Sequence, residues 1–238
     1  IINYKRVAIQ EFRYGSFITQ MIPLIGYKLH LSLKVILIGY VVSFNLFYLV
    51  VISLLIYRCR QFGLGILMAL YYFLFISDSY FWPVNEIHQA VAWMFLFFGS
   101  TFYLGKKQAH VGWLLPAFII LAFLTVFTHI VVIIPLFFLW IFFWLGKDNW
   151  PFSKQRSILL STLLVAIVAV KFLFVGKQSY DSEHLNGVLK ISLKDIIDSF
   201  NAPVVTTFLY RCITNYWITV LVFVTGLISL IKMKKTKL

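Results

Sequence analysis

The chain has 238 residues, of which 61% are hydrophobic, 19% aromatic and only 12% charged. A soluble domain is typically about 45–50% apolar and about 25% charged, so this composition excludes one and indicates an all-α, polytopic transmembrane helix bundle in a lipid bilayer. The formal net charge of +13 does not indicate nucleic acid as a partner, because the basic residues lie between and beside the apolar segments.

The first 34 residues precede the first long apolar segment. Apolar side chains recur there at roughly helical spacing, at Val7, Tyr14, Phe17, Ile18 and Met21. This pattern is typical of an amphipathic helix that lies in the plane of the membrane interface. Arg13 and Tyr14 lie on this predicted helix, and the guanidinium of Arg13 suits either a phosphate group or anionic lipid headgroups.

Seven apolar segments are candidate spans, since a spanning helix needs about 20 residues and the shorter segments can be accommodated by tilt or a thin bilayer. They are residues 35–57, 63–77, 89–104, 112–128, 130–145, 157–175 and 212–231. The run from 112 to 145 is divided where Thr128 and His129 interrupt it; one long kinked helix is the alternative, and it would reverse the orientation of everything downstream. Lys171 lies near the outer end of its segment, where it can reach the interface or bind phosphate.

Charge gives the expected orientation. If the connections alternate between sides, eleven of the 21 Lys and Arg residues fall on one side, together with only one acid, Asp148. The positive-inside rule makes that side cytoplasmic. We therefore expect the N-terminus outside, the C-terminus in the cytoplasm, and a bacterial inner membrane whose periplasmic or external side carries the site.

The expected organisation is a single transmembrane domain over residues 1–238. It has an external region at 1–34, six spans within 35–175, an external loop at 176–211, and the last span with a basic tail at 212–238. The loop contains "ISLKDIIDSF", in which Ser192 and Asp195 form a capping-box-like pair before a short amphipathic helix.

The external segment "SDSYFWPVNEIHQAV", residues 77–91, concentrates polar groups between two apolar runs. Asp78 either ends the second span in water or binds a ligand, and Trp82 belongs either to an aromatic belt or to a platform for a sugar or lipid. Asn85 is a predicted helix cap, and Glu86 is either a carboxylate that suits the helix dipole or a catalytic group. His88 lies about 200° from Glu86 on a helix, so the two do not share a face.

Four of the five histidines fall on the predicted external side: His30, His88, His129 and His184. Titratable groups suited to chemistry near neutral pH therefore concentrate there. His129, at the tip between two apolar helices, is either a functional group or an interfacial histidine. The sequence has no Walker A, GxGxxG, HExxH or GxSxG motif and no ladder of charges along one span.

The arrangement resembles the superfamily of integral-membrane glycosyltransferases with the GT-C fold, which use sugars linked to polyprenyl phosphate or diphosphate. The resemblance is carried by residues 12–44, by "FWPVNEIH" at 81–88 and by "FTHIVVIIPLFFLW" at 127–140. In that superfamily a catalytic acid, often in a D-x-D-like pattern, follows the first span. This sequence begins on the predicted external side and has no D-x-D, so we expect it to lack that span and that acid.

The resemblance implies transfer of a sugar from a polyprenyl-linked donor to an acceptor hydroxyl, with a carboxylate as general base. Basic groups or a divalent metal such as Mg²⁺ or Mn²⁺ would stabilise the phosphate. It implies catalytic roles for Glu86 and His88. It also implies substrate contacts from Arg13, Tyr14, Asp78, Trp82, Asn85 and His129.

Two alternatives come from other functional classes. A non-catalytic subunit of an envelope complex, with membrane protein partners, would explain the missing acid. A small-molecule transporter would need a polar site near the membrane midplane, and the sequence contains no convincing one.

Overall fold

A computed structural model describes residues 13–73, 85–146, 150–175 and 192–214, together with Trp217, Leu221, Val224 and Thr225. All regular elements in these ranges are helices, which confirms the predicted all-α class. The chain forms two compact units, residues 1–181 and 182–238, and each is described by itself.

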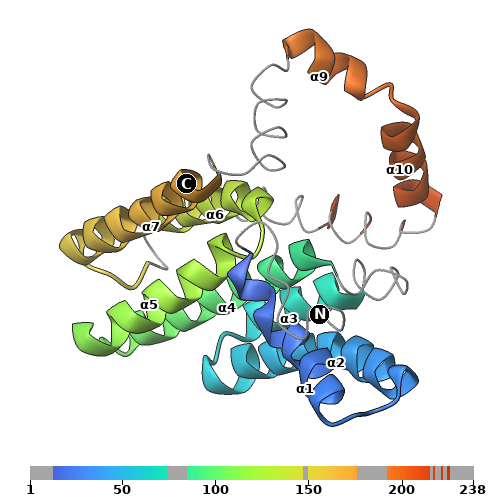
Figure 1. The fold of residues 1–238 in the computed structure, drawn as a ribbon. Coiled ribbons are helices and arrows are strands. Elements are labelled where there is room, and N and C mark those ends of the chain that lie inside the picture. Colours follow the sequence, from blue (N-terminus) through green and yellow to red (C-terminus); the bar gives the residue numbers. More distant parts are fainter. Residues whose placement is uncertain are drawn as a thin grey trace. The chain divides into compact units, whose positions relative to one another are not determined.

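The first unit contains the helices of the predicted segments between 35 and 175 (Figure 1). In chain order its elements are η1 (Tyr14–Ser16), α1 (Phe17–Lys28), α2 (Leu33–Ser53), η2 (Leu54–Arg58), α3 (Phe62–Tyr71), α4 (Glu86–Lys106), α5 (Val111–Val126), η5 (Ile130–Val132), α6 (Ile133–Leu145) and α7 (Lys154–Val175). Three helices among the described residues are long and apolar enough to cross a membrane, namely Leu33–Arg58, Glu86–Lys106 and Lys154–Leu173. The helices α3 and α5, and the helix that η5 and α6 form together, are apolar but shorter.

The apolar run from 112 to 145 is two helices, as predicted. Helix α5 ends at Val126, and the side chain of Thr128 hydrogen-bonds to the carbonyl oxygen of Leu124, in the last turn of α5. His129 then starts η5, because its Nδ1 accepts the backbone N–H of Val131 at 3.3 Å. Polar side chains thus satisfy backbone groups at the break, which is what ends one helix and begins the next.

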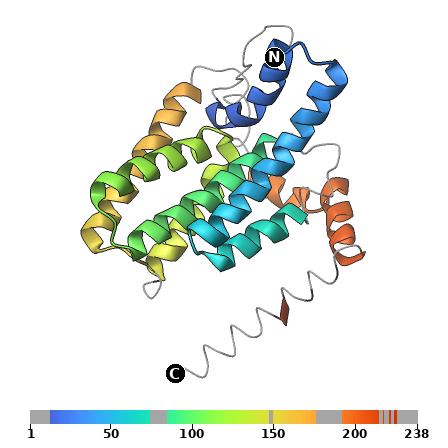
Figure 2. The same ribbon diagram turned by 90° about the horizontal axis from the view of Figure 1, so that it is seen from below.

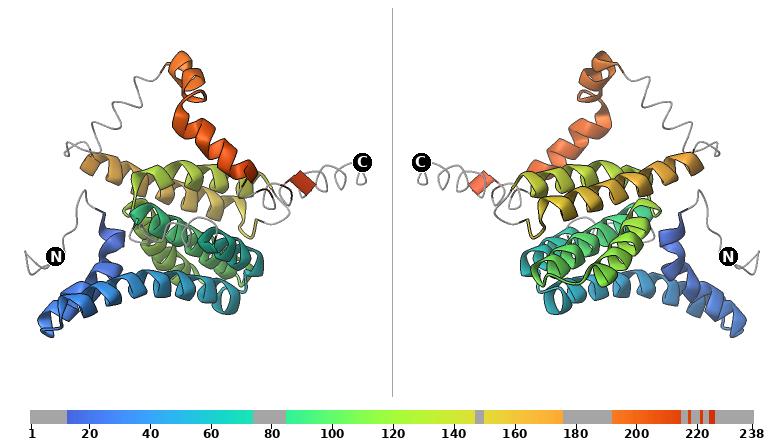
Figure 3. Two further views of the ribbon diagram at one scale, coloured as in Figure 1. Left: turned by 90° about the vertical axis from the view of Figure 1, so that its right-hand side faces the viewer. Right: turned by 90° about the vertical axis from the view of Figure 1, so that its left-hand side faces the viewer.

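Helix α4 is the centre of the first unit. In its most apolar stretch, 61% of the residues are buried, against 22% and 28% in the other two long helices. One face packs with α2 and α3 around Tyr48, Leu55 and Met68. The other packs with α5, α6 and α7 in an aromatic core that includes Phe97 and Trp140. Figure 2 shows α4 beside α5, and Figure 3 shows α6 beside α7, where Trp140 Nε1 donates to Ser161 Oγ at 2.9 Å.

Helices α1 and α2 form an antiparallel hairpin (Figure 2). Gly26 lies against Ile36 and Gly39 against Ile22, so positions on the two helices pair in opposite order. The predicted amphipathic helix therefore begins at Phe17, and Tyr14 belongs to the preceding 3₁₀ turn. Helix α1 packs antiparallel against α2, and its placement in the plane of the interface stays a prediction.

The second unit contains α9 (Leu193–Ser199) and α10 (Pro203–Thr214). The predicted capping box is present in α9: Ser192 Oγ accepts the Asp195 N–H at 3.2 Å, and Asp195 Oδ2 accepts the Ser192 N–H at 2.8 Å. The predicted external loop at 176–211 contains a second helix besides α9, since α10 begins at Pro203. Proline suits the first position of a helix, and Thr206, Thr207 and Arg211 make the described part of this helix more polar than the helices of the first unit.

Candidate functional site

An ion pair joins the segment before α1 to the start of α4. Arg13 Nη1 lies 2.5 Å from Glu86 Oε2, and the two side chains are 17% and 24% exposed. The helix start is fixed by Asn85, the predicted cap, whose Oδ1 accepts the Ile87 N–H at 2.9 Å. Three predicted site residues therefore meet at one place, although Arg13 lies 73 positions before Glu86 in the sequence.

The backbone of Gly15 is inserted between α4 and α5 beside this pair. Its N–H donates to the Phe127 carbonyl oxygen at 3.3 Å. Its carbonyl oxygen accepts from Gln89 Nε2 at 3.3 Å and from Trp93 Nε1 at 3.2 Å. A Cβ at this position would lie 1.8 Å from Thr128 Oγ1, so only glycine fits. We call this meeting place of residues 13–16, the start of α4 and the end of α5 the Gly15 junction.

Two buried amide oxygens at the Gly15 junction, those of Gln20 and Gln89, have no hydrogen-bond partner among the described residues. The orientation of each side-chain amide is fixed by the acceptor to which its NH₂ group donates. Gln89 must direct its NH₂ group to the Gly15 carbonyl, and Gln20 must donate to Ser16 Oγ, whose own proton goes to the Arg13 carbonyl oxygen at 2.8 Å. Buried polar atoms are nearly always hydrogen-bonded, so these two oxygens are suited to accept one further hydrogen bond each.

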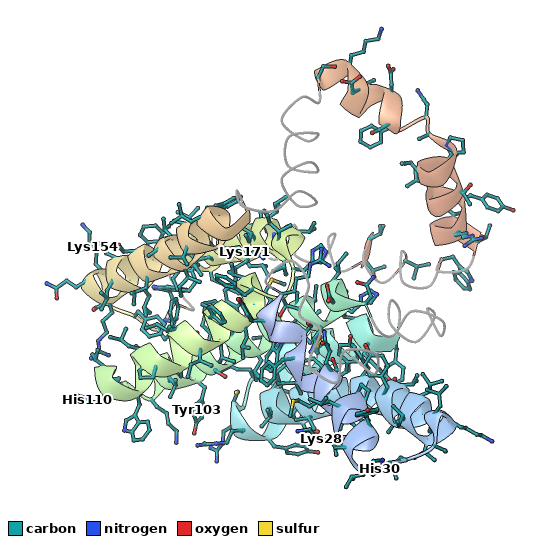
Figure 4. All side chains as sticks on the ribbon, viewed as in Figure 1. Lys28, His30, Tyr103, His110, Lys154 and Lys171 are labelled. Carbon is teal, nitrogen blue, oxygen red and sulfur yellow. The ribbon has the colours of Figure 1, made fainter. Side chains whose placement is uncertain are left out.

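Aromatic rings and a lysine complete the Gly15 junction. The ring of Tyr14 lies 6.2 Å from those of Phe123 and Phe127, which stack on each other at 4.2 Å. Lys171 of α7 is fully buried, with Nζ 5.4 Å from the centre of the Phe127 ring (Figure 4). The expectation that Lys171 reaches the interface is therefore wrong. A cation–π contact and the negative end of α5 favour its charge inside the bundle.

The histidines that the structure describes do not form a cluster. His88 Nδ1 lies 2.7 Å from the Tyr71 hydroxyl of α3, away from the face that carries Glu86. His129 caps η5, and His30 lies at the tip of the α1–α2 hairpin. Among the described residues, the concentration of histidines on one predicted side therefore does not produce a shared site.

A metal site finds no support in the described part of the chain, where no group of three His, Cys, Asp or Glu side chains could hold an ion. Gln20 and Gln89 offer oxygen atoms, but Glu86 is paired with Arg13. The possible Mg²⁺ or Mn²⁺ therefore enters no step below. Asp78 and Trp82, two predicted substrate contacts, lie outside the described residues.

An apolar groove of about 340 Å³ begins at the Gly15 junction. It is lined by Ile18, Thr19, Ile22, Ser43, Leu46, Phe47, Val50, Val51, Leu54, Trp93 and Leu96. Two of these residues also contact the junction: Trp93 donates to the Gly15 carbonyl oxygen, and Thr19 Oγ1 donates to that of Ser16 at 3.1 Å. The polar Gly15 junction therefore adjoins an apolar groove, which is an arrangement that suits an amphiphilic ligand.

Sequence reasoning missed Gly15, Gln20, Gln89 and Trp93 as parts of the site, and left Lys171 open between reaching the interface and binding phosphate. The two glutamines are the signal that could have found them, because an uncharged amide within an apolar run is costly to bury without partners. Comparisons with protein-family models, with curated proteins and with solved structures find no match. The functional argument therefore depends on the geometry of the Gly15 junction.

Proposed function

We propose that the chain is a membrane glycosyltransferase of the GT-C type that transfers a sugar from a polyprenyl-linked donor. The observation that carries the proposal is the Arg13–Glu86 ion pair beside the apolar groove. A polyprenyl-linked sugar has a long apolar chain, an anionic phosphate and a polar sugar. The groove suits the first of these, and the Gly15 junction suits the other two.

The roles of the charged groups follow from this arrangement. The acceptor oxygen would attack the anomeric carbon while the bond from that carbon to the phosphate oxygen breaks, and the phosphate leaves with the electron pair. Arg13 and Lys171 are cations suited to stabilise that leaving group. The carboxylate of Glu86 would accept a hydrogen bond from a sugar hydroxyl or take the acceptor proton, and the oxygens of Gln20 and Gln89 suit further hydroxyls.

The proposal includes the topology and the location. The apolar helices of the first unit and the segment 212–231 would be the seven spans, with the N-terminus outside and the C-terminus in the cytoplasm of a bacterial inner membrane. Basic residues at the ends of η2 and α4, and at the start of α7, support a cytoplasmic location for those ends. The Gly15 junction would then face the periplasm.

The test is Glu86→Gln in the full-length protein, followed by a glycan-transfer assay on membranes. We expect a loss of about 10²-fold or more in transfer, which is typical when a group that contacts the reacting atoms is removed. Asp198→Asn, which removes an exposed carboxylate of α9, is the matched control and should leave transfer unchanged. Unchanged transfer in Glu86→Gln would remove Glu86 from the mechanism.

The second candidate is a non-catalytic membrane subunit, and the same ion pair favours it, because a carboxylate paired with arginine can serve structure alone. The two functions differ in one measurement. For a subunit, Glu86→Gln would lower stability, and transfer by the assembled complex would fall only in proportion to the amount of folded protein. For an enzyme, transfer per folded molecule would fall.

A further inference from the structure

The tip of the α1–α2 hairpin, residues 28–35, is exposed at every position. It alternates polar and apolar side chains: Lys28, Leu29, His30, Leu31, Ser32, Leu33 and Lys34. The three leucines are 64%, 44% and 59% exposed. Figure 4 labels Lys28 and His30 at this tip. The backbone turns at His30, which has a φ of 55°.

The tip carries two lysines and a histidine, and the helices that form the hairpin add no acidic residue. Residues 13–73, which form η1 and the helices α1 to α3, contain no Asp or Glu. Lys28 ends α1 and Lys34 is the second residue of α2, so the turn brings two ammonium groups to one end of the hairpin. A group of negative charge is the complementary partner for such a surface.

The length of α2 and η2 sets the depth of this tip. Together they span 26 residues, which at about 1.5 Å per residue is about 39 Å. The hydrocarbon core is about 30 Å thick, and about 40–45 Å with the headgroup regions. A helix of this length that crosses the bilayer therefore places Lys34 at one headgroup region and Arg58 at the other.

We propose that the α1–α2 tip binds an anionic phospholipid, with Lys28 and Lys34 on its phosphate and Leu29, Leu31 and Leu33 at the boundary of the acyl chains. Leucine and lysine together are the combination that holds a segment at the membrane interface. The site is separate from the Gly15 junction and does not depend on the proposed enzyme activity. Its role is to fix the hairpin, and through α1 the Gly15 junction, at a defined depth in the bilayer.

A local fluorescent probe tests this proposal in the full chain. Leu31→Cys is labelled with bimane in a Cys212→Ala background, where the remaining Cys59 is buried and protected from the label. The protein is placed in phosphatidylcholine vesicles that contain a small, fixed fraction of nitroxide-labelled lipid, either phosphatidylglycerol or phosphatidylcholine. We expect stronger quenching by phosphatidylglycerol, with a local preference up to about 25-fold, because each lysine near an anionic surface contributes about fivefold.

Three variants decide the outcome. Lys28→Gln with Lys34→Gln should equalise quenching by the two lipids, and Lys28→Arg with Lys34→Arg should keep the preference, which excludes misfolding as the cause. Lys194→Gln with Arg211→Gln removes the same charge from α9 and α10 and should also keep it. Equal quenching in the starting protein, or a preference that survives the glutamine changes at the tip, would overturn the proposal.

Discussion

Arg13 and Glu86 are 73 residues apart in the sequence, and their side chains form an ion pair with 2.5 Å between Nη1 and Oε2. The pair joins the segment before α1 to the first residue of α4, which is the central helix of the first unit. The pair belongs to the Gly15 junction, which adjoins the apolar groove through Trp93 and Thr19. The pair's contribution to stability and its contribution to transfer can both be measured.

The ion pair should contribute to stability as a coupled unit. Arg13→Gln and Glu86→Gln should each lower the free energy of unfolding by about 1–3 kcal/mol, because each removes one member of a partly buried ion pair. The double change should cost less than the sum, and a double-mutant cycle measured by denaturant unfolding in bicelles gives the coupling. Additive losses would show that the two side chains do not interact.

Gly15 should not tolerate a methyl group. In Gly15→Ala the new Cβ would lie 1.8 Å from Thr128 Oγ1 and 2.6 Å from the Leu124 carbonyl oxygen, so α5 would have to move. We expect a loss of about 1–3 kcal/mol, which is typical of overpacking, measured as a lower melting temperature in detergent. Gly63→Ala is the control, since nothing lies within 4 Å of its Cβ position and alanine favours a helix. Equal melting temperatures for the two variants would contradict this packing.

The sequence was sufficient to predict the apolar helices of the first unit and several helix ends, because apolar runs and local caps determine them; α10 was not predicted. Asn85 and Ser192 cap α4 and α9 as predicted, and Thr128 and His129 divide α5 from α6. Local sequence patterns do not specify which distant segments lie side by side in space, so they could not predict that Arg13 would meet Glu86. They also could not show that Gly15 lies between two helices, or that Lys171 is buried over an aromatic ring rather than extended to the interface.

The hydrogen bond from His88 to Tyr71 connects α4 to α3 and should be structural. Tyr71→Phe removes the hydroxyl that lies 2.7 Å from Nδ1, and we expect a loss of about 1 kcal/mol in the free energy of unfolding. Tyr57→Phe is the control, because Tyr57 is 81% exposed. If His88 acts in transfer, Tyr71→Phe should also change the pH profile of transfer, whereas a purely structural bond would leave that profile in place.

The apolar groove should accept the donor's chain and should be blocked by added bulk. Leu46→Trp places an indole in the groove, and we expect the KM for a polyprenyl-linked donor to rise about tenfold, with little change in melting temperature. Leu37→Trp is the matched control: both leucines lie on α2 with side chains 53% and 54% exposed, but Leu37 does not line the groove. The same KM in both variants would show that the donor's chain lies elsewhere.

The capping box of α9 should make that helix sensitive to acid. Hydrogen bonds from the Ser192 hydroxyl and backbone N–H hold the pKa of Asp195 below its ordinary value of 3.8. A carboxyl group with a lowered pKa in the folded state stabilises the helix at pH values above its ordinary pKa. That contribution is lost as the pH falls through the lowered value, because the unfolded segment takes up a proton first.

Carboxyl carbon chemical shifts of Asp195, followed by NMR as the pH is lowered, measure this effect in the full chain. Ser192→Ala removes the hydroxyl, so the pKa of Asp195 should rise toward 3.8 and the backbone amides of α9 should exchange faster even at neutral pH. Asp195→Asn should give an α9 whose amide protection no longer changes with pH in the acidic range. An Asp195 that titrates at its ordinary pKa in the unmodified chain would mean that the capping box does not form in solution.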